Sequence, residues 1–166
     1  MNCQKRPREA EVLLGPLRFH LIGFDISCGI SEWIHHFDNV TMLVFLVDLR
    51  RYDEGVLEES ITLFDSLVNH PAFVKTSVIL LLANYPAFVQ KLSDVPFENY
   101  FPDYCGGRNG ARAVEYIRFR FMQRNRAMLN IYPRTGEVDD PGLRHLTFAT
   151  AKEILLCNEL RSAGMI

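Results

Sequence analysis

Acidic residues at the ends of apolar runs are the strongest chemical candidates in this sequence. Asp25 follows the run that begins at Leu17, and Asp48 follows Thr41–Val47. A carboxylate at the carboxyl end of a parallel strand lies where α/β proteins bind their ligands. Asp25 is therefore a candidate for binding a ligand or a metal ion, although a carboxylate in this position could instead cap the following turn.

Two other groups of reactive side chains allow more than one interpretation. Cys28 lies between Ser27 and Gly29 with no histidine beside it in the sequence, so it could be a nucleophile or simply a small residue in a turn. His35 and His36 have no third cysteine, histidine or carboxylate at the spacing of a metal site. Packing or a partner surface is therefore the favoured interpretation for the two histidines.

A basic helix is predicted at Ala111–Met128. Val114, Ile117, Phe121 and Met128 recur at helical spacing. The other faces carry five arginines, namely Arg112, Arg118, Arg120, Arg124 and Arg126. This basic surface could bind phosphate groups, and the alternative is an ordinary solvated helix face.

Hydrophobic spacing predicts the elements that would position these groups. Alternation with period two predicts a strand from Leu17 towards Asp25, and uninterrupted apolar runs predict buried parallel strands at Thr41–Val47 and Ser77–Leu82. Between those two strands, a set of apolar residues at helical spacing predicts a helix that ends at His70-Pro71: Leu57, Ile61, Phe64 and Val68.

The rest of the chain continues the alternation. We expect a helical turn near Phe88–Leu92, a turn at Asp139–Gly142, a last strand at Leu143–Ala149 and a final helix that a capping box opens at Thr150. Strands alternating with helices predict an α/β domain with a mainly parallel sheet. The carboxyl ends of these strands carry Asp25, Asp48, Ala83 and Ala149.

Composition excludes several classes of protein. The 166 residues, 48% of them hydrophobic, suit one compact domain, and a net charge of −2 disfavours a nucleic-acid-binding module. The longest apolar runs are shorter than the roughly 20 residues of a membrane span. The four cysteines are scattered without a C-x-x-C pair, which disfavours a zinc site or a disulfide framework and favours a reducing cytoplasm.

Several segments, in a fixed order, carry a family pattern. They are Asp25, Trp33–Thr41 (WIHHFDNVT), Ile61–Leu67 (ITLFDSL), Thr76–Leu82 (TSVILLL), Phe101–Tyr104 (FPDY), Thr147–Thr150 (TFAT) and Leu160–Ile166 (LRSAGMI). Together they resemble the α subunits of heterotrimeric G proteins, which carry D-V-G-G-Q, W-I-H-C-F-E-N-V-T, L-F-D-S-I, T-S-I-I-L-F-L, F-P-E-Y, T-C-A-T and a terminal L-K-D-C-G-L-F. The resemblance runs from about residue 17 to residue 166.

This resemblance implies a truncated Ras-like fold. Residues 17–166 would form part of a three-layer, P-loop NTPase-type α/β domain with a mainly parallel sheet, and residues 1–16 would be a tail. The sequence contains no G-x-x-x-x-G-K-[ST] motif. We therefore expect the phosphate-binding loop and the inserted helical domain of the family to be missing.

The resemblance also implies GTP or GDP and Mg²⁺ as cofactors. The residues that match the nucleotide-binding motifs are Asp25, Cys28, Ala83, Asn84, Pro86, Thr147, Ala149 and Thr150, with Asp25 contacting Mg²⁺ through water. The catalytic glutamine has no counterpart, and Pro86 replaces the aspartate that reads guanine in N-K-x-D. Because proline has neither a charge nor an N–H, we expect impaired GTP binding and hydrolysis.

The partners implied by the resemblance are the βγ dimer and a G-protein-coupled receptor. The βγ-facing segment matches Trp33, Ile34, His35 and Phe37, and the receptor-facing end matches Leu160, Gly164, Met165 and Ile166. With the T-C-A-T element at Thr147–Thr150, the C-terminal helix would be about three turns shorter than in the family.

Three functions remain open. The chain could be a divergent signal transducer, cytoplasmic or held at the inner face of the plasma membrane by its partners. It could instead be a non-enzymatic module or decoy that binds βγ or receptor. It could also be a remnant without function.

Overall fold

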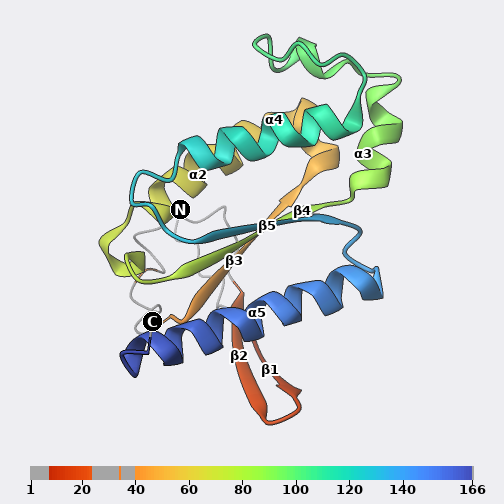
Figure 1. Ribbon diagram of the computed structural model, residues 1–166. Coiled ribbons are helices and arrows are strands. Elements are labelled where there is room, and N and C mark those ends of the chain that lie inside the picture. The colour runs from red at the N-terminus through yellow and green to blue at the C-terminus, as the bar shows by residue number, and fades with distance from the viewer. Residues whose placement is uncertain (1–7, 24–33, 35–39, 166) are drawn as a thin grey trace. The chain divides into compact units, whose positions relative to one another are not determined.

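The computed structural model describes residues 8–23, 34 and 40–165 of the chain (Figure 1). It divides into two compact units, Met1–Asp38 and Asn39–Ile166. The second unit has the predicted α/β class, with a parallel sheet covered by helices.

The described part of the first unit is a β-hairpin. β1 (Arg8–Leu14) pairs antiparallel with β2 (Leu17–Gly23), and Gly15, at a φ of +61°, lies in the turn between them. The strand predicted from Leu17 is confirmed, but it pairs with a segment that we expected to be a tail. The alternation of acidic and apolar residues in Glu9–Val12 is the sequence signal for β1, since alternating side chains point to opposite faces of a strand.

The second unit is built on a three-stranded parallel sheet of order β3-β4-β5. β3 (Met42–Asp48) and β4 (Ser77–Ala83) confirm the two predicted apolar strands, and every residue of the central β4 is buried. β5 (Ile131–Gly136) was not predicted. It contains Pro133, which is tolerated because β5 is an edge strand with one neighbour among the described residues.

Helices cover both faces of this sheet. Figure 1 shows two helices on one face, α2 (Val56–Val68) and α4 (Gly110–Gln123), and α5 (Pro141–Ser162) on the other. α3 (Tyr85–Leu92) follows β4. The 3₁₀ segments are η2 (Leu49–Glu54), η3 (Pro71–Phe73) and η4 (Phe97–Asn99). The three layers explain why β3 and β4 have uninterrupted apolar runs.

Three phenylalanines join the sheet to the helices above it. Phe64 of α2 lies 5.1 Å from Phe45 of β3 and 5.1 Å from Phe121 of α4, measured between ring centroids. The rings meet edge to face, a favourable arrangement of aromatic pairs. The predicted apolar face of α2 is confirmed, because its four residues are all buried: Leu57, Ile61, Phe64 and Val68.

A second aromatic cluster holds η2 against α3. The ring of Tyr52, 1% exposed, lies 5.5 Å from Phe88 and 5.4 Å from Phe97. Its hydroxyl donates to the carbonyl of Val95, and burial raises the pKa of Tyr52 to about 12. The hydroxyl, which is the only polar group of this buried side chain, is therefore hydrogen-bonded.

The predicted strand at Leu143–Ala149 is wrong, because these residues lie inside α5. Asp140 caps this helix by accepting hydrogen bonds from the backbone of Gly142 and Leu143, and Pro141 occupies its first turn. The turn predicted at Asp139–Gly142 is instead the capped start of this helix. With α5 beginning at Pro141, there is no basis for the expected shortening of the C-terminal helix.

The predicted helix at 111–128 also ends early, at Gln123. The following backbone is fixed by Asn69, at the end of α2. Its side-chain amide donates to the carbonyl of Arg124 at 2.8 Å, and its side-chain oxygen accepts from the N–H of Ala127 at 3.0 Å. Met128 then takes a φ of +56°, which a continuing helix cannot contain.

Candidate functional site

The carboxyl ends of the three parallel strands meet at one edge of the sheet. Asp48 ends β3 beside Ala83 at the end of β4, and Ala83 pairs in turn with Gly136 at the end of β5. Ligands of open α/β sheets bind outside this edge. It is therefore the candidate site within the described residues.

Asp48 is the most heavily bonded side chain of this edge. It accepts from two nitrogens of the Arg50 guanidinium, Nε at 3.0 Å and Nη2 at 2.7 Å, and from the backbone N–H of Arg50 at 3.1 Å. The side-chain amide of Asn84 donates to the same carboxylate at 2.8 Å. We call these three residues the Asp48 network.

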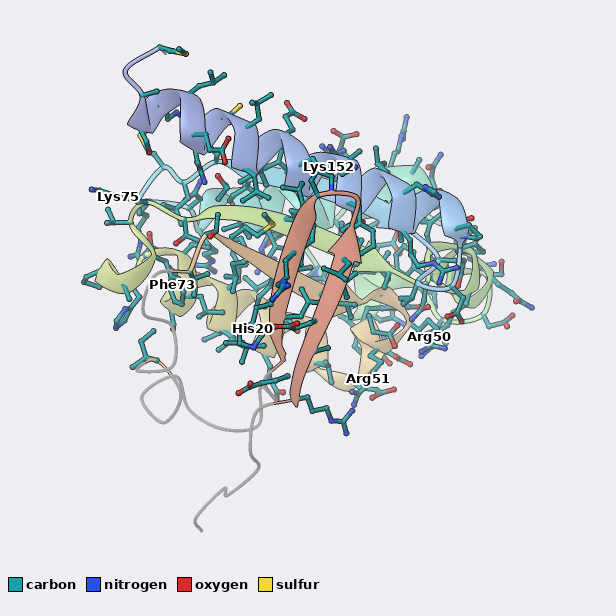
Figure 2. All side chains as sticks on the ribbon, turned by 90° about the horizontal axis from the view of Figure 1, so that it is seen from below. His20, Arg50, Arg51, Phe73, Lys75 and Lys152 are labelled. Atoms are coloured by element: carbon teal, nitrogen blue, oxygen red, sulfur yellow. The ribbon has the colours of Figure 1, made fainter. Side chains whose placement is uncertain are left out.

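These bonds hold Asp48 in its charged form. The hydrogen bond from Arg50 is the main cause, and with Asn84 it outweighs partial burial and lowers the pKa of Asp48 to about 2. Asp48 in turn raises the pKa of Arg50, with a smaller contribution from Glu137 after β5. Figure 2 labels Arg50, whose side chain extends outward from η2. The Asp48 network therefore leaves part of the guanidinium open to solvent.

The residues that match N-K-x-D lie at this edge of the sheet. Ala83 is buried at the end of β4, and Asn84 turns the chain into α3 with a φ of +62°. Asparagine is one of the few residues that adopt this left-handed conformation readily. Pro86 occupies the first turn of α3, where the missing N–H costs nothing.

The other nucleotide-site residues that we expected at this edge lie elsewhere. Thr147, Ala149 and Thr150 are inside α5, so the loop position predicted for them is wrong. The hydroxyls of both threonines donate to carbonyls one turn earlier in the helix. The Thr150 hydroxyl also accepts from Arg134 of β5 at 2.8 Å, so it joins α5 to the sheet.

Several predicted residues lie outside the described part of the chain: Asp25, Cys28, Trp33, His35, Phe37 and Ile166. Ile34 is described as a half-buried residue in 3₁₀ conformation. At the end of α5, Leu160 is half-buried and Met165 is 71% exposed. Gly164, with a φ of +69°, provides the left-handed residue that ends this helix.

Sequence reasoning missed two residues of the edge, Arg50 and Glu137. Arg50 has a local signal, because an arginine two residues after a strand-ending aspartate can fold back on it. Glu137 could not be identified from the sequence, because β5, the strand that it follows, was not predicted. We expected the last loop of the site to follow a strand that ends near Thr150. In the structure this loop follows Gly136, at the end of β5.

The described residues of this edge do not fit the cofactors that the resemblance implies. The Asp48 carboxylate is already bonded to Arg50 and Asn84, so Mg²⁺ would have to displace a guanidinium. No cluster of three or more metal-binding side chains occurs in the described ranges. The side chain of Pro86 offers no acceptor for the amide and amine protons of guanine.

In the described part of the chain, no helix combines the length and apolar character that crossing a bilayer requires.

Comparison with known proteins places this fold in a family. The sequence pattern of the G-protein alpha subunit family matches residues 17–155. The chain is 46% identical over 161 residues to the guanine nucleotide-binding protein alpha-2 subunit of Saccharomyces cerevisiae, with 90% of this chain and 35% of the relative covered. It is 42% identical over 169 residues to the alpha-3 subunit of Neurospora crassa, with 95% and 47% covered. The chain thus spans less than half the length of these curated relatives, and it belongs to the G-protein alpha subunit family.

Proposed function

We propose that this chain is a signal-transducing G-protein alpha subunit whose guanine-nucleotide chemistry is impaired. The observation that carries the proposal is the Asp48 network. It engages the carboxylate at the end of β3 in an ion pair with Arg50 and in a hydrogen bond from the amide of Asn84, at the edge where a nucleotide would bind.

Guanine is recognised by an acceptor that faces its N–H groups, and a buried polar group left unpaired costs about 1–3 kcal/mol. Pro86 supplies no such acceptor. Asp48 could do so only after release from Arg50, which would leave a guanidinium without its carboxylate. Both routes weaken binding, so we expect a dissociation constant well above about 10 μM for GDP and GTP with Mg²⁺.

Titration calorimetry of the 166-residue chain with GDP and GTP tests this proposal, with ATP as a control for base selectivity. We expect no saturable binding in the low micromolar range and no difference between the three nucleotides. Saturable guanine-selective binding at micromolar concentration or tighter would contradict the proposal.

Hydrolysis should fall with binding. No residue of the chain matches the family's water-orienting glutamine, so the attacking water would lack the group that positions it. A single-turnover phosphate-release assay should show no rate above that of the buffer. Release that depends on protein concentration would exclude the impaired-enzyme proposal.

Partner binding without nucleotide chemistry is the second candidate. α5 is continuous over 22 residues, and Leu156 on it and Met165 just after it are exposed, which supports receptor binding through the family-like end. The βγ proposal rests on Trp33 and its neighbours. If Trp33 is a binding hot spot, Trp33→Ala should weaken capture of purified βγ by at least about 2 kcal/mol with little change in melting temperature.

The alternative is that Trp33 packs in the core of the chain. In that case Trp33→Ala should lower the melting temperature. Failure of the wild-type chain to capture either βγ or receptor would leave the remnant interpretation. In the transducer and partner-binding proposals the chain works in the cytoplasm, where partners could hold it at the inner face of the plasma membrane.

A further inference from the structure

The outer face of α4 exposes apolar side chains that the fold does not use. The buried side of this helix, which includes Phe121, packs on the sheet and α2. Phe119 lies on the opposite side and is 57% exposed, and Met122, one turn later, is 43% exposed. Two apolar side chains three residues apart share a helix face, so they form one ridge.

The charged residues around this ridge are mostly arginines. Arg108, Arg112 and Arg118 are exposed and have no carboxylate within ion-pair distance among the described residues. Arg120 is paired with Glu58, and Asp65 pairs with the arginines after the helix. The one acidic residue of α4, Glu115, is exposed and lies one turn before Phe119 on the same face. Three arginines without carboxylate partners against this one glutamate make the surface locally cationic on a chain of net charge −2.

We propose that the outer face of α4, which comprises Arg112, Glu115, Arg118, Phe119 and Met122, binds an anionic lipid surface together with Arg108 in the loop just before the helix. Arginines without carboxylate partners would contact lipid phosphates, while Phe119 and Met122 would enter the interface between headgroups and acyl chains. This is the arrangement by which amphipathic helices lie on membranes.

Shape and charge both favour a bilayer as the occupant. Figure 1 shows α4 in the helical layer on the side of the sheet away from α5, and the exposed Phe119 and Met122 form a ridge on it. A deformable lipid surface can accept a ridge, whereas a protein would need a preformed apolar groove with an acidic rim. The attraction also matches in sign, since anionic membranes attract locally cationic segments whatever the net charge of the chain.

Vesicle flotation with the full chain tests the proposal. The two vesicle types are phosphatidylcholine alone and phosphatidylcholine with about 30% phosphatidylserine. We expect the chain to float with the anionic vesicles, and the bound fraction to fall steeply as salt is raised. Arg112→Glu with Arg118→Glu should weaken this binding by at least tenfold, and Phe119→Ser with Met122→Ser by several fold.

Control variants on other elements test whether binding depends on the α4 face or on any exposed arginine or apolar side chain. Arg144→Glu reverses an exposed arginine of α5, on the opposite face of the sheet, and Val74→Ser removes an apolar side chain that is 62% exposed. Both should float like the wild type, and circular dichroism should show that all four variants are folded.

Three outcomes would overturn the proposal. They are the absence of wild-type binding to anionic vesicles, equal binding to both vesicle types, and equal losses in the α4 and control variants. An acidic protein as the true partner of α4 would give the first of these outcomes. None of these results depends on nucleotide binding, so the test is independent of the proposed function.

Discussion

The side-chain amide of Asn84 donates a 2.8 Å hydrogen bond to the carboxylate of Asp48 and so joins the carboxyl ends of β4 and β3. Asn84 stands where the resemblance places the lysine of N-K-x-D. A lysine would bring a charge to this position, whereas the neutral amide lets Arg50 provide the counterion of Asp48. At this edge of the sheet, the polar groups of Asp48 and Asn84 are therefore bonded to each other within the protein.

The Asp48 network should make stability depend on acid pH. The pKa of Asp48 is about 2 in the folded chain against an ordinary 3.8, so its contribution is present above about pH 4 and is lost as pH falls towards 2. After allowance for solvent around the half-exposed Arg50, we expect Asp48→Asn to lose about 1–2 kcal/mol at pH 7. Urea unfolding at pH 7, 4 and 2.5 should show this difference shrinking.

Asp103→Asn is a suitable control for the Asp48 variant, because Asp103 is exposed and belongs to a loop. It should change the unfolding free energy by less than about 0.5 kcal/mol. An Asp48→Asn difference that stays constant from pH 7 to pH 2.5 would mean that the charge of Asp48 contributes nothing.

Truncation of two phenylalanines of α4 should have very different effects on stability. Phe121 is fully buried against Phe45 and Phe64, so Phe121→Ala should cost about 3–5 kcal/mol. Phe119→Ala, at an exposed position two residues away, should change stability by less than about 0.5 kcal/mol. Thermal melts of the two variants make the comparison, and similar losses would contradict the orientation of α4.

The hydroxyl of Tyr52 should contribute to stability separately from its ring. Tyr52→Phe keeps the buried ring but leaves the Val95 carbonyl without its donor, which should cost about 1–3 kcal/mol. Tyr100→Phe is the control, since Tyr100 is 43% exposed and its hydroxyl has no bond to any described residue. Chemical denaturation should separate the two variants, and equal effects would argue against the Tyr52 hydrogen bond.

Gly110 should tolerate no side chain. A Cβ atom at this position would lie 2.5 Å from a methyl group of Val89 in α3, closer than real contacts allow. Gly110→Ala should therefore cost about 1–3 kcal/mol although alanine favours helices. Ala111→Ser, at the exposed next position, should be nearly neutral in the same denaturation experiment. A stabilised Gly110→Ala variant would show that α3 and α4 are packed less closely.

The helices and strands that were predicted correctly are those whose hydrophobic pattern fits only one kind of secondary structure. Val78–Leu82 is apolar throughout and could only be a buried strand or a short piece of helix, and it is too short for the latter. β5 escaped prediction because Pro133 and Arg134 interrupt its apolar pattern, and an edge strand accepts both. Asp140-Pro141 fits a turn and a helix start equally well, so α5 and its neighbouring strand were assigned incorrectly.

The site was predictable in position but not in its contacts. Spacing placed Ala83 at the carboxyl end of a strand, where it lies, whereas Pro86, expected in a loop, occupies the first turn of α3. It could not show that Asn84 reaches Asp48, because the two are 36 residues apart and depend on the parallel register of β3 and β4. Contacts of this kind follow from strand pairing, which local sequence does not encode.

The two bonds that Asn69 makes with the backbone after α4 also bear on the order of folding. They close a loop of 55 residues that contains β4, α3 and α4, so they can form only after those elements have been brought together. Contacts of such sequence separation slow folding and tend to form late. Asn69 is thus a natural reporter of the last steps of assembly, and its truncation should speed unfolding more than it slows refolding.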